Sequence, residues 1–221
     1  MTNAYETLMR AIAEDRVLKD VDLSGAQLAG AQLEGLKGDF LIFAGANLSG
    51  ANLQGAHLTD CDFPSANLRG ANFAGATLWQ CQFRGADARE AVFHSSQAEN
   101  NFWREVDFRG ADFRNAILSD TLFSQSDLRA ARLDGCQGVD VSFQQANLAG
   151  ASLTGCSLPG AKFRGANLSG ADLSGGRFLG ADFTGANLEG ARWTGADLTG
   201  ARFDGDPPPG SAEQSDAGSE E

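Results

Sequence analysis

Four cysteines carry the most reactive chemistry in this sequence. Cys61 and Cys81 are 20 residues apart, and Cys136 and Cys156 have the same spacing. Thiols can pair as disulfides, or they can bind zinc when Cys-x-x-Cys or histidine partners stand beside them. Neither kind of partner accompanies these cysteines, so we predict no metal site. The choice between disulfides and free thiols depends on how the chain places residues 20 positions apart.

The histidines and the motifs of known catalysts give no sign of a reaction centre. His57 and His94 are far apart in the sequence, and we expect them to be separate surface residues. The sequence has no Gly-x-Ser-x-Gly nucleophile elbow, no Gly-Lys-Ser/Thr phosphate loop and no paired-histidine zinc protease motif. We therefore predict no catalytic residue, no cofactor and no metal, and we interpret the protein as non-enzymatic.

The charge balance excludes some partners. The 221 residues include 17 basic and 29 acidic side chains, a formal net charge of −12. Six acids and no base lie from residue 204 onward, so residues 21–203, with 19 acids and 14 bases, carry only −5. This balance argues against direct nucleic-acid binding, which needs Lys and Arg at the phosphates. Because there is no 18-residue apolar run and no signal peptide, we predict a cytoplasmic protein without membrane insertion.

One set of charges recurs at a fixed spacing. Arginines repeat every 20 residues at Arg69, Arg89, Arg109 and Arg129, and aspartates stand two positions before the last three, at Asp87, Asp107 and Asp127. We interpret these as interleaved ladders that neutralise each other on an exposed sheet. The alternative is a positive stripe for a partner or nucleic acid, which the neighbouring aspartates disfavour.

These spacings belong to an internal repeat of five residues. Every fifth residue from Leu23 to Phe203 gives 37 positions, of which 18 are Leu, 13 are Phe and 2 are Trp. Alanine usually stands two residues before each of these centres, and glycine usually stands two residues after. Residues two apart point to the same side of an extended backbone, and glycine permits a turn. Each unit therefore predicts a short extended side and a corner.

A second period of 20 residues is superimposed on the first. Eight of the 13 central Phe fall in ten positions spaced 20 residues apart from Leu23. Four sides per coil are therefore predicted, with an aromatic column whose rings lie ~4.8 Å apart and only small residues opposite it. All four cysteines take the inward position that alanine usually holds. We interpret them as buried free thiols rather than disulfides.

The tandem unit Ala-(Asn/Asp)-(Leu/Phe)-x-x, as in Ala46-Asn47-Leu48-Ser49-Gly50, resembles the pentapeptide repeat family. The resemblance covers about 185 of the 221 residues. It implies an all-β solenoid, a right-handed quadrilateral β-helix of about nine coils with four units per coil. Members of this family have many roles, and some protect DNA gyrase as mimics of duplex DNA.

The sequence divides into three regions. Residues 1–20 are predicted to be an N-terminal helical cap, residues 21–205 the β-helix, and residues 206–221 a disordered acidic tail. The helix is expected at about 4–15, with a capping box at Asn3 and Glu6. Its apolar face is expected to hold Tyr5, Leu8, Met9 and Ile12.

Residues 86–105 match the repeat least well. Ser96 and Asn101 take inward positions, and Ala88 and Ala98 replace large centres. The segment could be an underpacked coil or could loop out by a multiple of five residues. The unbroken frame favours continuity.

Outward apolar residues gather on the fourth side of each coil and at the corner that follows it. We call this surface the apolar edge; its residues are Phe40, Ile42, Trp79, Phe102, Ile117, Leu122, Val139 and Leu179. The same edge carries the acids Asp39, Asp60, Glu99, Asp120 and Asp140. Apolar anchors among acids are typical of a protein interface. The alternative is that these residues only cover a corner groove or contact residues 86–105.

Two functions are compatible with a protein-binding rod. The family resemblance and the acidity imply a type II topoisomerase such as DNA gyrase as partner. Gyrase-protecting relatives commonly carry a C-terminal dimerising module, whereas here a proline-rich stretch follows Phe203. The alternative is a scaffold or adaptor that docks a secretion or membrane-associated complex through Phe40, Trp79 and Ile117. A DNA-binding rod using the arginines is least favoured, and the oligomeric state is open, with a dimer as one option.

Overall fold

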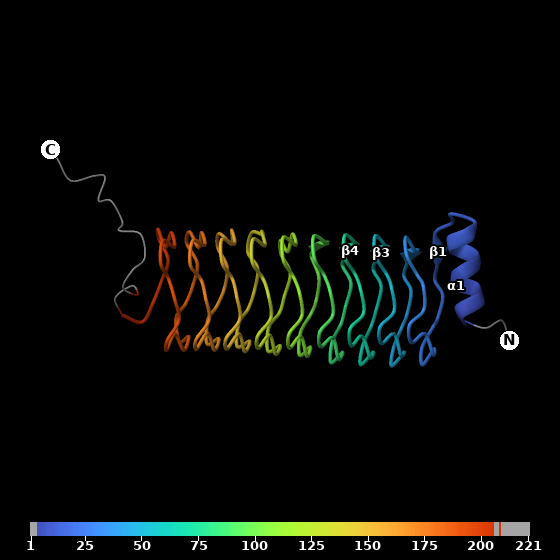
Figure 1. Ribbon diagram of the computed structural model, residues 1–221, viewed down its shortest axis with the longest axis horizontal. Helices are drawn as coiled ribbons and strands as arrows, with labels where there is room; N and C mark the ends of the chain where they lie inside the picture. The colour runs from blue at the N-terminus through green and yellow to red at the C-terminus, as the bar shows by residue number, and fades with distance from the viewer. Residues whose placement is uncertain (1–3, 206–207, 209–221) are drawn as a thin grey trace.

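The computed structural model describes residues 4–205 and residue 208. It is a rod of stacked coils with one helix, α1 (Ala4–Ala13), lying across its N-terminal end (Figure 1). The predicted tail, residues 206–221, lies outside the described residues except for Pro208. The predicted quadrilateral β-helix is confirmed by the pairing of each coil with the next.

Helix α1 covers the first coil with a narrow face of small and aliphatic residues. Leu8 and Ala11 are fully buried in the core that continues through the rod, and Ile12 packs against it. The expected face was wrong in one residue, because Tyr5 is 38% exposed and Ala11 takes the buried position. Asn3 of the expected capping box lies outside the described residues.

Successive coils are joined by parallel pairing between residues 20 apart. On the fourth side, this pairing forms one parallel sheet of five strands in chain order: β1 (Leu18–Lys19), β2 (Lys37–Asp39), β3 (His57–Thr59), β4 (Thr77–Trp79) and β5 (Gln97–Glu99). Single parallel bridges link the other sides, and they continue the fourth side beyond β5. Strand β1 pairs with β2 before residue 21, where the ladder was expected to begin.

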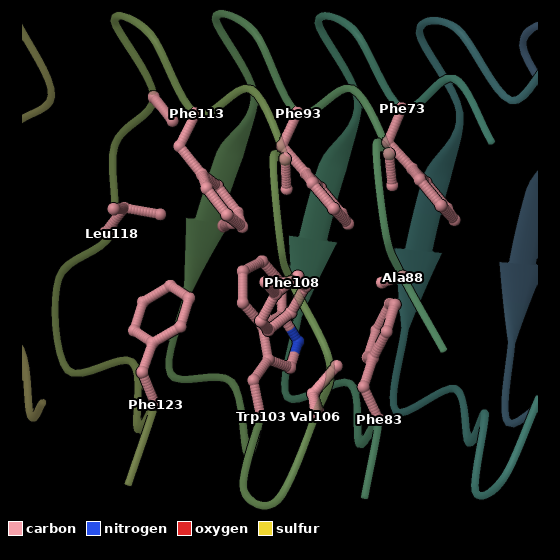
Figure 2. Close-up of a cluster of buried hydrophobic side chains, with 14 of the residues drawn as sticks. Phe73, Phe83, Ala88, Phe93, Trp103, Val106, Phe108, Phe113, Leu118 and Phe123 are labelled. Atoms are coloured by element: carbon pink, nitrogen blue, oxygen red, sulfur yellow. The ribbon is translucent and has the colours of Figure 1, made fainter. Parts of the chain in front are cut away.

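The core contains a long row of aromatic rings on the first side and a shorter row on the third side. On the first side, nine rings from Phe43 to Phe203 form eight neighbouring pairs with centroids 4.7–5.2 Å apart, which confirms the predicted column. The expectation of only small residues opposite it was wrong. Phe73, Phe93 and Phe113 stack on the third side at 5.0 and 4.8 Å, and Figure 2 shows this second row facing the first. Alanines inside the corners leave enough width for both rows.

Residues 86–105 form a continuous coil, as the unbroken frame favoured. The small centres Ala88 and Ala98 are followed by two larger ones, because Trp103 takes the place of the usual Phe on the first side and Phe108 that of the usual Leu on the second (Figure 2). Trp103 lies 5.2 Å from Phe93 and 5.6 Å from Phe108, measured between ring centroids. The poor repeat match is therefore a local exchange of small and large centres.

Inward polar residues in this region repair open corners of the chain. At an ordinary corner, the amide of the inward alanine donates to the carbonyl three residues earlier, as Ala46 does to Phe43 at 3.0 Å. At the corner from 78 to 81, Asn101 bridges this gap instead: its Oδ1 accepts from the Cys81 amide at 2.8 Å, and its Nδ2 donates to the Leu78 carbonyl at 3.0 Å. Thr121 and Ser126 bridge two further corners in the same way.

Candidate protein-binding surface

The four cysteines are free and buried, as predicted. Two of them do more than fill space. The Cys61 thiol lies 3.5 Å from the Gly38 carbonyl oxygen and 3.3 Å from that of Thr59, and the Cys81 thiol lies 3.5 Å from those of Leu58 and Trp79. These are weak versions of the corner bridge made by Asn101. Burial raises the pKa of the Cys81 thiol well above its usual value, so this group is not an activated nucleophile.

The histidines are separated, as expected. His57 is exposed, whereas His94 is half-buried with Nε2 beside the Ser95 hydroxyl at 3.3 Å. Across residues 4–205 and residue 208, no three His, Cys, Asp or Glu side chains are grouped so that they could hold a metal ion. In the same part of the chain, no helix has the length and apolar character needed to cross a membrane.

The arginine column is neutralised by its own aspartates. Arg89 makes two hydrogen bonds to Asp87 of its own coil, at 2.8 and 2.6 Å, and its Nε lies 3.7 Å from Asp107 of the next coil. Arg109 repeats the pattern, and Arg129 pairs with Asp127. These contacts hold the pKa of Asp87 below its usual value, chiefly through the hydrogen bond from Arg89. The positive stripe considered from the sequence is therefore not a free cationic surface.

The apolar edge is exposed. Its members include most of the large apolar residues at the surface of the described chain: Phe40 (53% exposed), Ile42 (41%), Trp79 (42%), Phe102 (47%), Ile117 (37%) and Val139 (52%). Leu122 and Leu179, also expected here, are half-buried. Ile42 and Phe102 belong to one bridge ladder on the first side, and Trp79 is in β4 on the fourth. The alternative that these residues merely cover a groove does not fit exposures near one half.

The corner of the apolar edge has an unusual backbone. Seven consecutive coils have a residue other than glycine in the left-handed region there, with φ of 51–57°: Asp20, Phe40, Asp60, Gln80, Asn100, Asp120 and Asp140. The other three corners use glycine in most coils, and this one does so from Gly160 onward. Asn and Asp tolerate this conformation, but for Phe it is strained. Sequence reasoning missed this signal, although the absence of glycine from one corner was visible.

Carboxylates surround the apolar residues of the edge. Asp39 pairs with Lys19 at 2.8 Å, and Asp140 lies 4.0 Å from Lys162. Asp60, Asp62, Glu99 and Asp120 make no ion pair with any described residue. Burial and the neighbouring Asp60 raise the pKa of Asp62. Asp62 was not selected from the sequence, although the 20-residue period places it in one ladder with Ile42 and Phe102.

A hollow adjoins the edge on the first side. It has a volume of about 320 Å³ and is lined by Gln82, Arg84, Phe102, Arg104 and Glu105. Arg84 is paired with Glu105 at 3.2 Å, so Arg104 is the lining base without an ion pair in the described chain. The edge therefore combines a flat apolar surface with one shallow depression beside Phe102.

The family model for pentapeptide repeats matches eight copies across residues 42–80, 66–100, 105–137, 139–175 and 177–205. No curated protein gives a significant sequence match. HetL, a pentapeptide repeat protein involved in heterocyst differentiation regulation from the cyanobacterium Nostoc sp. strain PCC 7120, is 29% identical in its solved structure. The match covers 90% of this chain and 98% of HetL, with a TM-score of 0.50.

A second solved structure shows the same fold. Trypsin-treated QnrB1, a plasmid-mediated fluoroquinolone resistance protein, is 24% identical over 85% of this chain and 92% of its own, with a TM-score of 0.51. Its identity is too low to transfer a function. The family match covers well over half of the sequence and coincides with the coils of the rod. The chain belongs to the pentapeptide repeat family.

Proposed function

We propose that this chain is a non-enzymatic protein-binding solenoid and that the apolar edge is its docking surface. The observation that carries the proposal is Phe40, which is 53% exposed although its backbone has a φ of 55°. A left-handed backbone costs a residue with a side chain about 1–2 kcal/mol. Phe40 gains little from burial in return, and glycine serves the equivalent position from Gly160 onward. Strain at an exposed aromatic residue points to a role outside the fold.

The composition of the edge supports the same function. Phe40, Trp79 and Phe102 are large and rigid, and such side chains supply much of the binding energy in protein interfaces. The seven corners without glycine span six coil intervals, or about 29 Å at the spacing between parallel strands. A surface of that length can hold a peptide segment or the side of a small domain.

The test removes two anchors without touching the core. Trp79→Asp with Ile117→Asp should abolish specific photo-crosslinking from a benzoylphenylalanine placed at position 40. The matched control, Ala74→Asp with Ser174→Asp, puts the same charges on the third side, away from the edge. If the Trp79/Ile117 variant captures the same proteins as wild type, the edge is not the docking surface.

A second candidate function is interaction with a type II topoisomerase such as DNA gyrase. It is supported by the rod shape and by the unpaired carboxylates along one edge. The neutralised arginine column and the modest charge of the coils weigh against a DNA-like surface on all sides. Purified protein at micromolar concentration should then inhibit DNA supercoiling by gyrase or protect gyrase from drug poisoning. No effect on supercoiling or on drug poisoning would exclude this candidate. Both candidates are consistent with a cytoplasmic location.

A further inference from the structure

We propose that the partner presents a cationic, apolar-rich peptide segment to the apolar edge. This inference rests on the proposed docking function and specifies the chemistry of the partner. Aromatic and aliphatic side chains of the edge stand among carboxylates, and four of these carboxylates, Asp60, Asp62, Glu99 and Asp120, make no ion pair with any described residue.

The clearest place is the coil between Phe40 and Trp79. Here Asp60 occupies the corner and Asp62 stacks directly on Ile42 of the preceding coil. The two carboxylates repel each other, and neither makes an ion pair with any described residue. Burial, and to a lesser degree this repulsion from Asp60, raises the pKa of Asp62. A lysine or arginine from a partner would relieve this repulsion while its apolar neighbours cover Phe40 and Trp79.

Further along the edge the pattern continues. Glu99 follows Trp79 in the fourth-side ladder, and Asp120 lies at the corner one coil after Asn100. Of the bases nearest to the edge, Lys19 pairs with Asp39, Lys37 with Asp15 and Arg84 with Glu105. Arg104 beside Phe102 makes no ion pair with any described residue. The unsatisfied charge of the edge is therefore negative over most of its length.

Other occupants fit less well. Nucleic acid and anionic lipid surfaces carry negative charge and would be repelled by these carboxylates. A second copy pairing edge to edge would bring like charges together. A positively charged peptide with leucine-like side chains matches both the charge and the apolar anchors.

Trp79 provides a direct probe, because it is 42% exposed while Trp103 and Trp193 are buried in the core. The full-length protein is titrated with a synthetic amphipathic peptide of about 20 residues built from leucine and lysine, long enough to cover the edge as a helix. A second peptide carries glutamate in place of every lysine. Binding of the lysine peptide should change Trp79 fluorescence and weaken as salt is added, and the glutamate peptide should not bind.

Two variants locate the interaction. Asp60→Asn with Asp62→Asn should weaken binding of the lysine peptide about fivefold to tenfold, as expected for the loss of two exposed charge contacts. Glu34→Gln with Glu189→Gln is the control, because it removes the same charge from exposed positions off the edge. Equal weakening by both variants, or equal binding of both peptides, overturns the proposal.

The outcomes also separate this inference from the docking function. If Trp79→Asp with Ile117→Asp loses its crosslinked partners while Asp60→Asn with Asp62→Asn keeps them, the docking surface stands and the cationic partner is wrong. If both variants keep them, the docking surface itself is wrong. A wild-type dimer that dissociates in the Trp79/Ile117 variant would assign the edge to a second copy and overturn the cationic peptide.

Discussion

The corner bridge made by Asn101 can be tested against a neighbour of the same type. Asn101 and Ser96 are both fully buried polar residues in the inward position, on adjacent sides of the rod. Asn101 satisfies one amide and one carbonyl of the preceding coil, at 2.8 and 3.0 Å. The Ser96 hydroxyl has no hydrogen-bond partner in the described structure. The two alanine substitutions should therefore have opposite signs.

The magnitudes follow from these contacts. Asn101→Ala leaves the Cys81 amide and the Leu78 carbonyl buried without a partner, at about 1–3 kcal/mol each, so the free energy of unfolding should fall by about 2–6 kcal/mol. Ser96→Ala removes a buried hydroxyl that gains no hydrogen bond, so the free energy of unfolding should stay the same or rise by about 1 kcal/mol.

The assay is urea denaturation followed through the fluorescence of buried Trp103, with the m-value compared between variants. Both substitutions remove polar atoms from one region of the core, so a general effect of altered packing would act on both. Equal destabilisation by the two variants, or a neutral Asn101→Ala, would refute the idea that inward polar side chains replace corner hydrogen bonds.

Four further predictions concern other parts of the rod. Phe123→Ala should lower the free energy of unfolding by about 3–5 kcal/mol, since it removes a ring stacked 5.0 Å from that of Phe143 in the next coil. Outward Ser124→Ala should change this free energy little. Urea denaturation compares the two variants, and similar losses would mean that the inward register is wrong. Phe40→Gly should leave thermal stability unchanged or raise it by up to about 1 kcal/mol while reducing partner capture, and a marked loss of stability would contradict the strain argument. Arg114 lowers the pKa of Asp112 chiefly through its hydrogen bond. The stability that this pair adds is therefore complete above the unfolded pKa of about 4 and is lost as pH falls through the folded pKa. In Asp112→Asn, the free energy of unfolding measured across acidic pH should lack this pH-dependent contribution. Cys81, with its raised pKa, should react with a thiol reagent only in denaturant, and rapid reaction of the native protein would show that the core opens.

The repeat made most of the fold predictable. Inward side chains recur at the same two positions of every five-residue unit, and this pattern predicts the coil. The 20-residue spacing of Phe43, Phe63 and Phe83 predicts the number of sides in each coil. The second aromatic row on the third side was missed because its three phenylalanines are too few to produce a period. The corner bridges were also missed, since the polarity of Asn101 was visible but the carbonyl that it reaches lies 23 residues earlier.

The functional surface was only partly predictable. Side-chain direction follows from the frame, so the exposure of Phe40 and Trp79 could be predicted. The strained backbone at the corner could not be predicted, because the sequence does not give the φ angle of each residue. The negative charge of the edge could not be predicted either, because it depends on which carboxylates form ion pairs in the folded rod. Asp39 and Asp60 look alike in sequence, yet only Asp39 has a lysine within reach.

The spacing of the hydrogen bonds has a consequence for how the chain folds. Apart from helix α1 and the corner turns, backbone bonds join residues about one coil apart, such as Asn47 to Ala26 and Leu48 to Asn67. Each coil therefore needs only the coil before it, and short sequence separation of this kind favours fast folding. A growing chain can add coils one at a time as it leaves the ribosome, with every completed coil serving as the template for the next. Exposed pairing edges are then confined to the most recently added coil throughout synthesis.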